Sequence, residues 1–125
     1  MLFADGLMGF SQGGSLALQI VALQQLRLST EEGDAPRLRF LWIQSSRLPR
    51  DPSCKGLFDA PIELPCFVNH AEDDTAVRPE ETRALIARLQ APTVSCLPGG
   101  GHSLMSISHN PEAGEKLRFF LQAQQ

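Results

Sequence analysis

The sequence lacks an apolar run long enough to cross a membrane. Its longest apolar segment, LALQIVAL at residues 16–23, is interrupted by Gln19 and followed by two further glutamines, whereas a spanning helix needs about 20 consecutive apolar residues. Residues 1–10 contain no Lys or Arg and are interrupted by Asp5, so they do not resemble a signal peptide. We therefore expect no membrane span.

Excess positive charge and paired cysteines are also lacking. Lys and Arg number 11 against 14 Asp and Glu, for a net charge of -3, so there is no basic character of the kind that binds nucleic acid or anionic membranes. The three cysteines, Cys54, Cys66 and Cys96, form no C-x-x-C pair, which favours reduced thiols over disulfides or a zinc site. These features predict a cytoplasmic location without a nucleic-acid partner. Cys66 and Cys96 are expected in the core.

Apolar segments of strand type and of helix type alternate along the chain. Its 125 residues and 42% apolar content suit a single domain over residues 1–125. Four short runs predict strands, at 5–10, 38–44, 65–71 and 93–98, and three longer ones predict helices, at 14–28, 78–91 and 110–122. Polar residues 29–36 predict a loop, and proline-rich residues 45–64 predict an irregular excursion. Strands that alternate with helices favour a parallel sheet, and the expected class is α/β.

The stretch GLMGFSQGGSLAL, residues 6–18, places Ser11 where a strand pattern changes to a helix pattern. With Gly9 and Gly13 it forms G-x-S-x-G, the pattern of a nucleophile elbow, a tight turn that exposes a serine. The two glycines would let strand and helix pack closely around the serine, and the backbone N–H of Gln12 would point toward an oxyanion. The alternative is a polar serine in an ordinary turn.

Two further polar residues follow later predicted strands. Asp74 comes after the third strand, and His102, in the stretch PGGGH, comes after the fourth. Loops at the carboxyl ends of parallel strands collect functional groups. The chain order Ser, Asp, His is the one that accompanies a nucleophile elbow. We interpret His102 as the base that takes the proton of Ser11, and Asp74 as the carboxylate that orients the imidazole.

Other polar residues compete for these roles. Asp73 adjoins Asp74, and either carboxylate could instead cap a turn. His70 lies within an apolar strand pattern and is interpreted as an interior histidine whose ring is satisfied by hydrogen bonds. His109 is interpreted as a solvated residue before a helix. Three residues of the excursion either border the site or are solvated: Arg47, Arg50 and Phe58.

Three blocks of the chain resemble the FSH family of serine hydrolases, which are α/β-hydrolases: DGLMGFSQGGSLAL, APIELPCFVNHAEDDTAVRPEETRAL and LPGGGHSL. The resemblance covers nearly the whole chain. It implies Ser11 as nucleophile, His102 as base and Asp74 as acid, with no metal and no organic cofactor. The family's pattern around the acid is G-x-x-D-x-x-V. Here Ala71 stands in place of the glycine, which leaves Asp73 as the alternative acid.

The implied activity is hydrolysis of a small-molecule carboxylic ester or thioester through an acyl-serine intermediate. The acyl-protein thioesterase and carboxylesterase family is also similar around GFSQGG, and it is a second candidate within the same chemistry. A non-catalytic α/β module that serves in assembly is the alternative from a different functional class.

The resemblance also implies that about half a hydrolase domain precedes the elbow strand, including the loop that supplies a second oxyanion donor. Ten residues precede Ser11. We therefore expect a partial α/β-hydrolase fold, with the N-terminal strands missing and weak activity or none in this short chain. The uncovered edge of the elbow strand would favour self-association.

Overall fold

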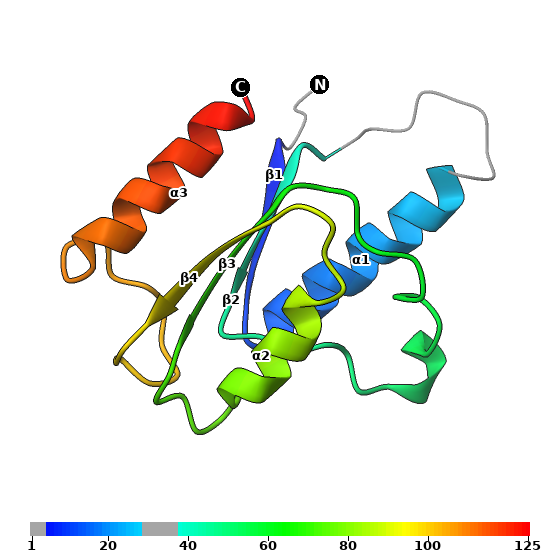
Figure 1. Cartoon of the computed structure of the whole chain (residues 1–125). Helices are drawn as coiled ribbons and strands as arrows, with labels where there is room; N and C mark the ends of the chain where they lie inside the picture. The colour runs from blue at the N-terminus through cyan, green and yellow to red at the C-terminus, as the bar shows by residue number, and fades with distance from the viewer. Residues whose placement is uncertain (1–4, 29–37) are drawn as a thin grey trace.

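The computed structural model describes residues 5–28 and 38–125, which form a four-stranded sheet with helices on both faces (Figure 1). In chain order the elements are β1 (Gly6–Phe10), α1 (Gln12–Leu28), β2 (Phe40–Gln44), the 3-10 helix η1 (Pro52–Cys54), β3 (Cys66–Ala71), α2 (Pro79–Ile86), β4 (Pro92–Leu97) and α3 (Pro111–Ala123). Each predicted strand and helix is present at its expected place. The loop expected at 29–36 lies outside the described residues.

The four strands are parallel and follow one another across the sheet in the order β1-β2-β3-β4. Gly9 of β1 lies opposite Ile43 of β2, which in turn lies opposite Val68 of β3. Because all strands point the same way, their carboxyl ends meet along one edge of the sheet, where the loops that follow them come together. The predicted α/β class, with four parallel strands and flanking helices, is confirmed.

Side chains alternate between the two faces of the sheet, and each face has its own apolar core. On one face Leu41, Ile43 and Val68 pack with buried residues of α1 and α2. On the other face Phe67 packs against Phe120 of α3, with a distance of 5.7 Å between ring centroids. Figure 1 shows α1 and α2 on one side of the sheet and α3 on the other. Packing on both faces holds the strand ends, and therefore the loops after them, in place.

The second helix is shorter than the sequence pattern predicts. It was expected to continue to residue 91, but α2 ends at Ile86. The following backbone instead binds the excursion, since the N–H of Ile62 donates to the carbonyl of Arg88 and the N–H of Gln90 donates to the carbonyl of Ile62, each at 2.9 Å. Pairing with a distant segment therefore ends the helix before Pro92 could do so.

The two strand cysteines differ in burial. Cys66 lies in β3 and is fully buried, and burial raises the pKa of its thiol to about 12. Cys96 was expected in the core but is exposed, and among the described strands its strand, β4, pairs with β3 alone. Partial burial and a hydrogen bond from Cys96 Sγ to Glu72 Oε1, at 3.0 Å, raise the pKa of this thiol to about 11. Neither thiol is therefore activated as a thiolate.

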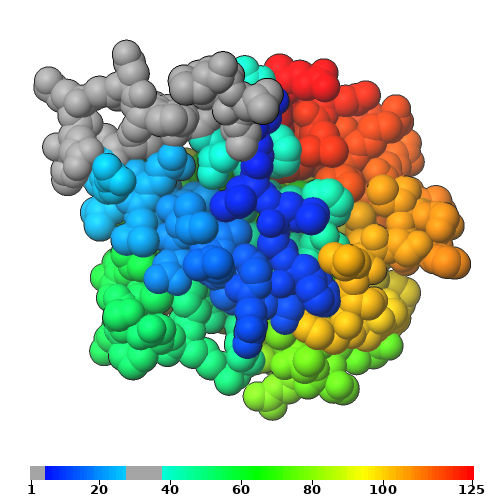
Figure 2. All heavy atoms as spheres, turned by 180° about the vertical axis from the view of Figure 1, so that it is seen from behind, coloured from blue at the N-terminus to red at the C-terminus, as the bar shows by residue number. Residues whose placement is uncertain are grey.

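The β1 side of the molecule exposes apolar surface. Among the described strands β1 pairs with β2 alone, and its Met8 side chain is 54% exposed. The helix α1 buries one side against the sheet and exposes Leu16, Ile20 and Leu23 on another; we call these three residues the α1 stripe. Figure 2 shows β1 and α1, in blue, at the surface on this side. Within the described residues no helix combines the length and the apolar character that spanning a membrane requires.

Candidate active site

Ser11 occupies the turn between β1 and α1 and has a strained backbone. Its φ is 54°, a left-handed conformation that is uncommon for residues other than glycine. The turn is held from both sides, because the N–H of Ser11 donates to the carbonyl of Gln44 at 2.9 Å and its carbonyl accepts from the N–H of Gly14 at 3.1 Å and of Ser15 at 3.2 Å. Strain of this kind at a turn marks candidate functional residues. The expected elbow geometry is present.

Close packing at the elbow depends on Gly9 and Gly14. A Cβ at Gly9 would overlap the backbone carbonyl of Gly13, and a Cβ at Gly14 would overlap the hydroxyl of Ser46. A Cβ at Gly13 would meet no atom within 4 Å. Gly13 was expected to share the steric requirement with Gly9, but it contributes only its backbone, because its side-chain position faces open space. The second residue that must lack a side chain is Gly14, which faces the loop after β2.

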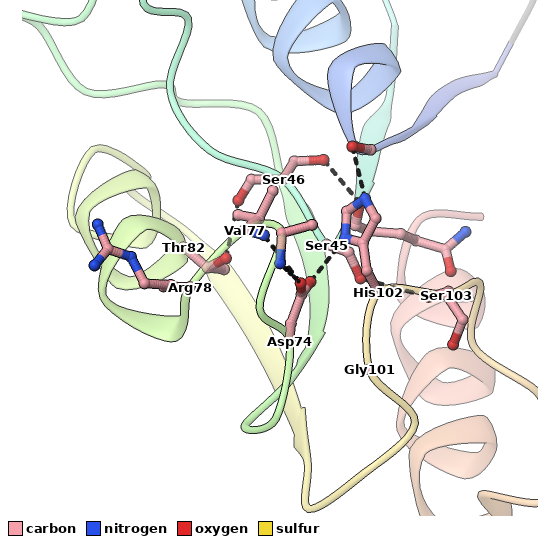
Figure 3. A network of polar contacts seen from close by, with 12 residues as sticks. Ser45, Ser46, Asp74, Val77, Arg78, Thr82, Gly101, His102 and Ser103 are labelled. Atoms are coloured by element: carbon pink, nitrogen blue, oxygen red, sulfur yellow. Dashed lines mark hydrogen bonds and ion pairs between the residues drawn. The ribbon is translucent and has the colours of Figure 1, made fainter.

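His102 lies in the glycine-rich loop after β4 and reaches back to the elbow. Its Nε2 is 2.9 Å from Ser11 Oγ, and its ring stacks near Phe10 with centroids 5.0 Å apart. The preceding Gly100 and Gly101 have φ values of 109° and 63°, conformations that glycine adopts without steric cost. The loop can therefore turn sharply enough to bring the imidazole to Ser11, and Figure 3 shows Gly101 and His102 on this loop.

Asp74 binds the other side of the same imidazole. Its Oδ2 is 2.8 Å from His102 Nδ1, while its Oδ1 accepts from the N–H groups of Ala76 and Val77, each at 2.9 Å (Figure 3). The side chain is only 1% exposed. Burial acts to raise its pKa, but the hydrogen bonds from His102, Val77 and Ala76 outweigh burial, and the pKa of Asp74 lies below its usual value. Asp74 is therefore an ionised carboxylate near neutral pH.

These contacts fix which imidazole nitrogen carries the proton. An ionised carboxylate can only accept hydrogen bonds, so Nδ1 of His102 must donate to Asp74. In the neutral imidazole Nε2 then holds a lone pair that faces the hydroxyl of Ser11. The arrangement can take a proton from the serine and hold the resulting imidazolium next to a negative charge.

The neighbouring Asp73 occupies a different place. Its Oδ1 accepts from the N–H of Gly101 at 2.9 Å, so it binds the backbone of the glycine-rich loop. The carboxylate that contacts the His102 ring is that of Asp74. Asp73 thus helps to hold the loop. No contact between Asp73 and the imidazole supports Asp73 as the alternative acid.

Sequence reasoning missed a set of buried amides beneath the site. The amide of Asn69 accepts from Trp42 Nε1 at 2.7 Å and donates to Gln44 Oε1 at 3.4 Å. The same Gln44 oxygen accepts from the N–H of Met105 at 3.1 Å, just beyond His102. These bonds join β2 and β3 to the loop that carries the histidine. The available sequence signal was a polar residue inside two apolar strands, in FLWIQ and CFVNHA.

The other two histidines lie apart from the serine. His70 in β3 is 3% exposed, and its Nδ1 has no hydrogen-bond partner among the described residues. Burial is the main cause that lowers its pKa. His109 is exposed and pairs with the hydroxyl of Ser106 at 2.9 Å. His70 is therefore interior as expected, but the expectation that its ring would be satisfied by hydrogen bonds is wrong for Nδ1. The exposure of His109 fits its solvated interpretation. Within the described part of the chain no group of three or more His, Cys, Asp or Glu residues could hold a metal ion.

A cavity of about 430 Å³ opens beside the serine. Its walls include Phe10, Ser11, Gln12, Arg47, Ala76 and Val77. Of the three uncertain residues of the excursion, Arg47 therefore borders the site. Arg50 is 67% exposed, and Phe58 is buried in the core. Gln12 begins α1, so its N–H has no acceptor within the helix and is available to a ligand in this cavity.

Comparisons with known proteins bear on this geometry. A family model described as "Serine hydrolase (FSH1)" matches residues 3–105. Esterase OVCA2 from Mus musculus is 30% identical over 111 residues, which covers 87% of this chain and 46% of that protein. Esterase OVCA2 from Homo sapiens is 29% identical over 112 residues, with the same coverage. The chain spans about half the length of the curated relatives it matches.

Solved structures share the fold at lower identity. Alpha/beta hydrolase domain-containing protein 10 from mouse is 13% identical with a TM-score of 0.69, which covers 100% of this chain and 64% of that one. Arabidopsis thaliana SOBER1 is 22% identical with a TM-score of 0.65, which covers 95% of this chain and 52% of that one. The sheet and its flanking helices therefore form part of an α/β-hydrolase fold.

Proposed function

The chain belongs to the serine hydrolase (FSH1) family, and from this premise we propose that it hydrolyses carboxylic esters or thioesters through an acyl-serine intermediate. The observation that carries the proposal is the continuous hydrogen-bonded series from Ser11 Oγ through the His102 imidazole to Asp74, at 2.9 Å and 2.8 Å. A strained serine at a strand-to-helix turn supports it further.

In the first step the serine becomes acylated. Ser11 Oγ attacks the carbonyl carbon while its proton passes to Nε2 of His102, and Asp74 stabilises the imidazolium. The carbonyl oxygen takes up negative charge, and the free N–H of Gln12 donates to it. The tetrahedral intermediate then expels the alcohol or thiol, which receives the proton from Nε2. The acyl group remains bound to Ser11 Oγ.

In the second step water releases the acyl group. His102, neutral again, accepts a proton from a water molecule whose oxygen attacks the acyl carbon. Collapse of this second intermediate breaks the bond to Ser11 Oγ, and the imidazolium returns the proton to the serine. The products are a carboxylic acid and the free enzyme, and both protons have passed through one nitrogen.

Hydrolases of this fold take one oxyanion donor from the residue after the nucleophile and a second from a loop that precedes the elbow strand. Among the described residues Gln12, at the start of α1, is placed to be the first of these donors. Loss of one oxyanion donor lowers turnover by about 10²- to 10³-fold. Covalent labelling needs a single attack by the serine, and it is therefore a better first test than steady-state hydrolysis.

The test is reaction with a neutral fluorophosphonate probe followed by mass spectrometry of the labelled peptide. We expect a label on Ser11 in the wild type and none in Ser11→Ala. Ser15→Ala is the matched control, because Ser15 lines the same cavity but donates its hydroxyl to the carbonyl of Arg47. A wild type that stays unlabelled, or a label that persists in Ser11→Ala, would contradict the proposal.

The labelling experiment, together with a comparison of two substrates, distinguishes the proposal from two alternatives. A non-catalytic assembly module, favoured by the exposed α1 stripe, predicts an unlabelled wild type. An enzyme similar to the acyl-protein thioesterases predicts labelling together with faster hydrolysis of a thioester than of the oxygen ester of the same acid. Rates measured for a thioester and an oxygen ester with the same acyl group therefore test the thioesterase alternative.

A further inference from the structure

Arg47 is the charged residue among the walls of the cavity beside Ser11. Its side chain is 28% exposed, and no acidic side chain contributes to the same walls. The backbone at this position is anchored to α1, since Ser15 Oγ donates to the carbonyl of Arg47 at 2.6 Å. Arg47 therefore lines the cavity next to the serine, from a backbone that is hydrogen-bonded to α1.

The nearest carboxylate, that of Glu81 in α2, is already largely occupied. Its Oε2 accepts from the N–H of Arg78 at 3.0 Å, and its Oε1 accepts from Arg50 Nη2 at 2.7 Å. Arg47 Nη1 lies farther away, at 3.6 Å from the same Oε1. A guanidinium has five N–H donors, so the long pair with Glu81 leaves most donors of Arg47 without a protein acceptor in this cluster.

Two guanidinium groups compete for one carboxylate next to the cavity. Arg47 and Arg50 share a single carboxylate, that of Glu81. The hydrogen bond from Arg50 is the main cause that holds the pKa of Glu81 below its usual value, with smaller contributions from Arg78 and Arg47. One carboxylate cannot neutralise two guanidinium groups. Arg47, which lines the cavity, can therefore bind another anion.

We propose that Arg47 binds a carboxylate carried by the substrate, so that the preferred ester is one with a negative charge a few bonds from the scissile carbonyl. This inference rests on the proposed function, because it concerns the same cavity and the same serine. Arginine suits the task, since its planar fork can donate two parallel hydrogen bonds to one carboxylate. The charged end of the substrate would be held at Arg47 while its carbonyl lies at Ser11.

A purely structural role makes a different prediction. If Arg47 served only to pair with Glu81, then Glu81→Gln would change activity toward charged and neutral esters as Arg47→Met does. If Arg47 binds substrate, then Glu81→Gln removes a competing acceptor and keeps or increases the preference for a charged ester. The two variants therefore separate a binding role from a structural one.

The experiment compares two esters with acyl chains of equal length, methylumbelliferyl butyrate and methylumbelliferyl hemisuccinate, each corrected for its rate in buffer. We expect the wild type to favour the hemisuccinate in kcat/KM by about ten-fold, the lower end of what a charge-assisted hydrogen bond contributes. In Arg47→Met the ratio should fall to near one, and Arg47→Lys should keep part of it. Raising the ionic strength should lower the ratio in the wild type and leave the ratio of Arg47→Met unchanged.

Arg50→Met is the matched control, because Arg50 contacts the same Glu81 but is not part of the cavity wall; its ratio should stay at the wild-type value. A second pair, phenyl butyrate and carboxyphenyl butyrate, places the charge on the leaving group. An Arg47-dependent preference in either pair supports the proposal and shows which side of the ester is charged. Equal ratios in wild type and Arg47→Met for both pairs would overturn it, even with Ser11 labelled by the neutral fluorophosphonate. An unlabelled Ser11 would instead refute the proposed function.

Discussion

The centre of the sheet and its β1 side differ in how completely they are covered. All six residues of β3 are buried, and the loops that follow β3 and β4 satisfy the polar atoms of Asp74 with three hydrogen bonds. In β1 only Gly9 is buried, and the adjoining helix exposes the α1 stripe. The centre of the sheet is buried like the interior of a globular protein, whereas the β1 side presents apolar surface to solvent.

The proposed site spans both regions. Asp74 and His102 come from loops of the well-covered region, while Ser11 comes from the end of β1. A backbone hydrogen bond from Ser11 to Gln44 at 2.9 Å joins the two. The chemistry and the exposed surface are therefore separable, and substitutions should be able to damage one without the other. The predictions below use that separation, from the largest expected effect to the smallest.

The largest effect is expected for Asp74→Asn in the well-covered region. The oxygen of the amide can still accept from Ala76 and Val77, so its NH₂ group would face Nδ1 of His102. The imidazole would then carry its proton on Nε2, the wrong nitrogen for accepting one from Ser11. We expect the rate of fluorophosphonate labelling and of ester hydrolysis to fall by about 10⁴-fold.

Asp73→Asn is the matched control for Asp74→Asn. Its oxygen can still accept from the N–H of Gly101, and it has no contact with the imidazole. We expect a loss of less than about ten-fold, since a hydrogen bond of this kind contributes about 1 kcal/mol. Equal losses in the two variants, measured as labelling rates, would mean that the acid has been assigned to the wrong residue.

A smaller effect is expected at the elbow, where the two regions meet. Gly9→Ala would place a methyl group against the carbonyl of Gly13, and overpacking of this kind costs about 1–3 kcal/mol. Gly13→Ala has open space for its methyl group and, at an ordinary helical position, should stabilise by about 0.5–1 kcal/mol. Urea unfolding of both variants measures the contrast. Equal destabilisation by the two would show that the elbow is packed differently.

Much of the fold and the proposed site could be predicted from the sequence because both depend on local signals. Strand and helix periods differ, and G-x-S-x-G marks a sharp turn whose neighbours in the chain are also its neighbours in space. The order of Ser11, Asp74 and His102 could be interpreted because parallel strands bring their carboxyl ends together. Each element could be read from a short segment, and the rule for parallel strands then related the three segments to one another.

The remaining features depend on contacts between distant segments, which a single sequence does not display. Gly14 must lack a side chain because Ser46 lies against it, and α2 ends early because the residues that follow it bind Ile62. The hydrogen bond between Gln44 and Asn69 can be predicted only if β2 and β3 are known to be neighbours. The role proposed for Arg47 likewise depends on a loop 36 residues after Ser11 in the chain that returns to the elbow.

The smallest effect is expected on the exposed side, where we predict weak association between two copies of this chain. The helix α1 has no charged residue from position 12 to 26, and β1 has none either. Two copies of this surface would therefore not repel one another. Among the described strands β1 pairs with β2 alone, so its other edge offers further backbone hydrogen bonds. Sedimentation velocity over a range of concentrations should show a reversible dimer. A wild type that stays monomeric throughout would contradict the prediction.

Ile20→Lys tests whether that association uses the α1 stripe. It places a positive charge in each copy of an apolar surface, and we expect dimerisation to weaken by about ten-fold, because an uncompensated charge at an interface costs more than 1 kcal/mol. Phe119→Lys is the matched control, because Phe119 is also an exposed apolar residue but lies on α3, on the other face of the sheet. Both variants should unfold within about 0.5 kcal/mol of the wild type and should keep their label on Ser11. A loss of labelling in Ile20→Lys alone would show that the exposed side and the proposed site are coupled after all.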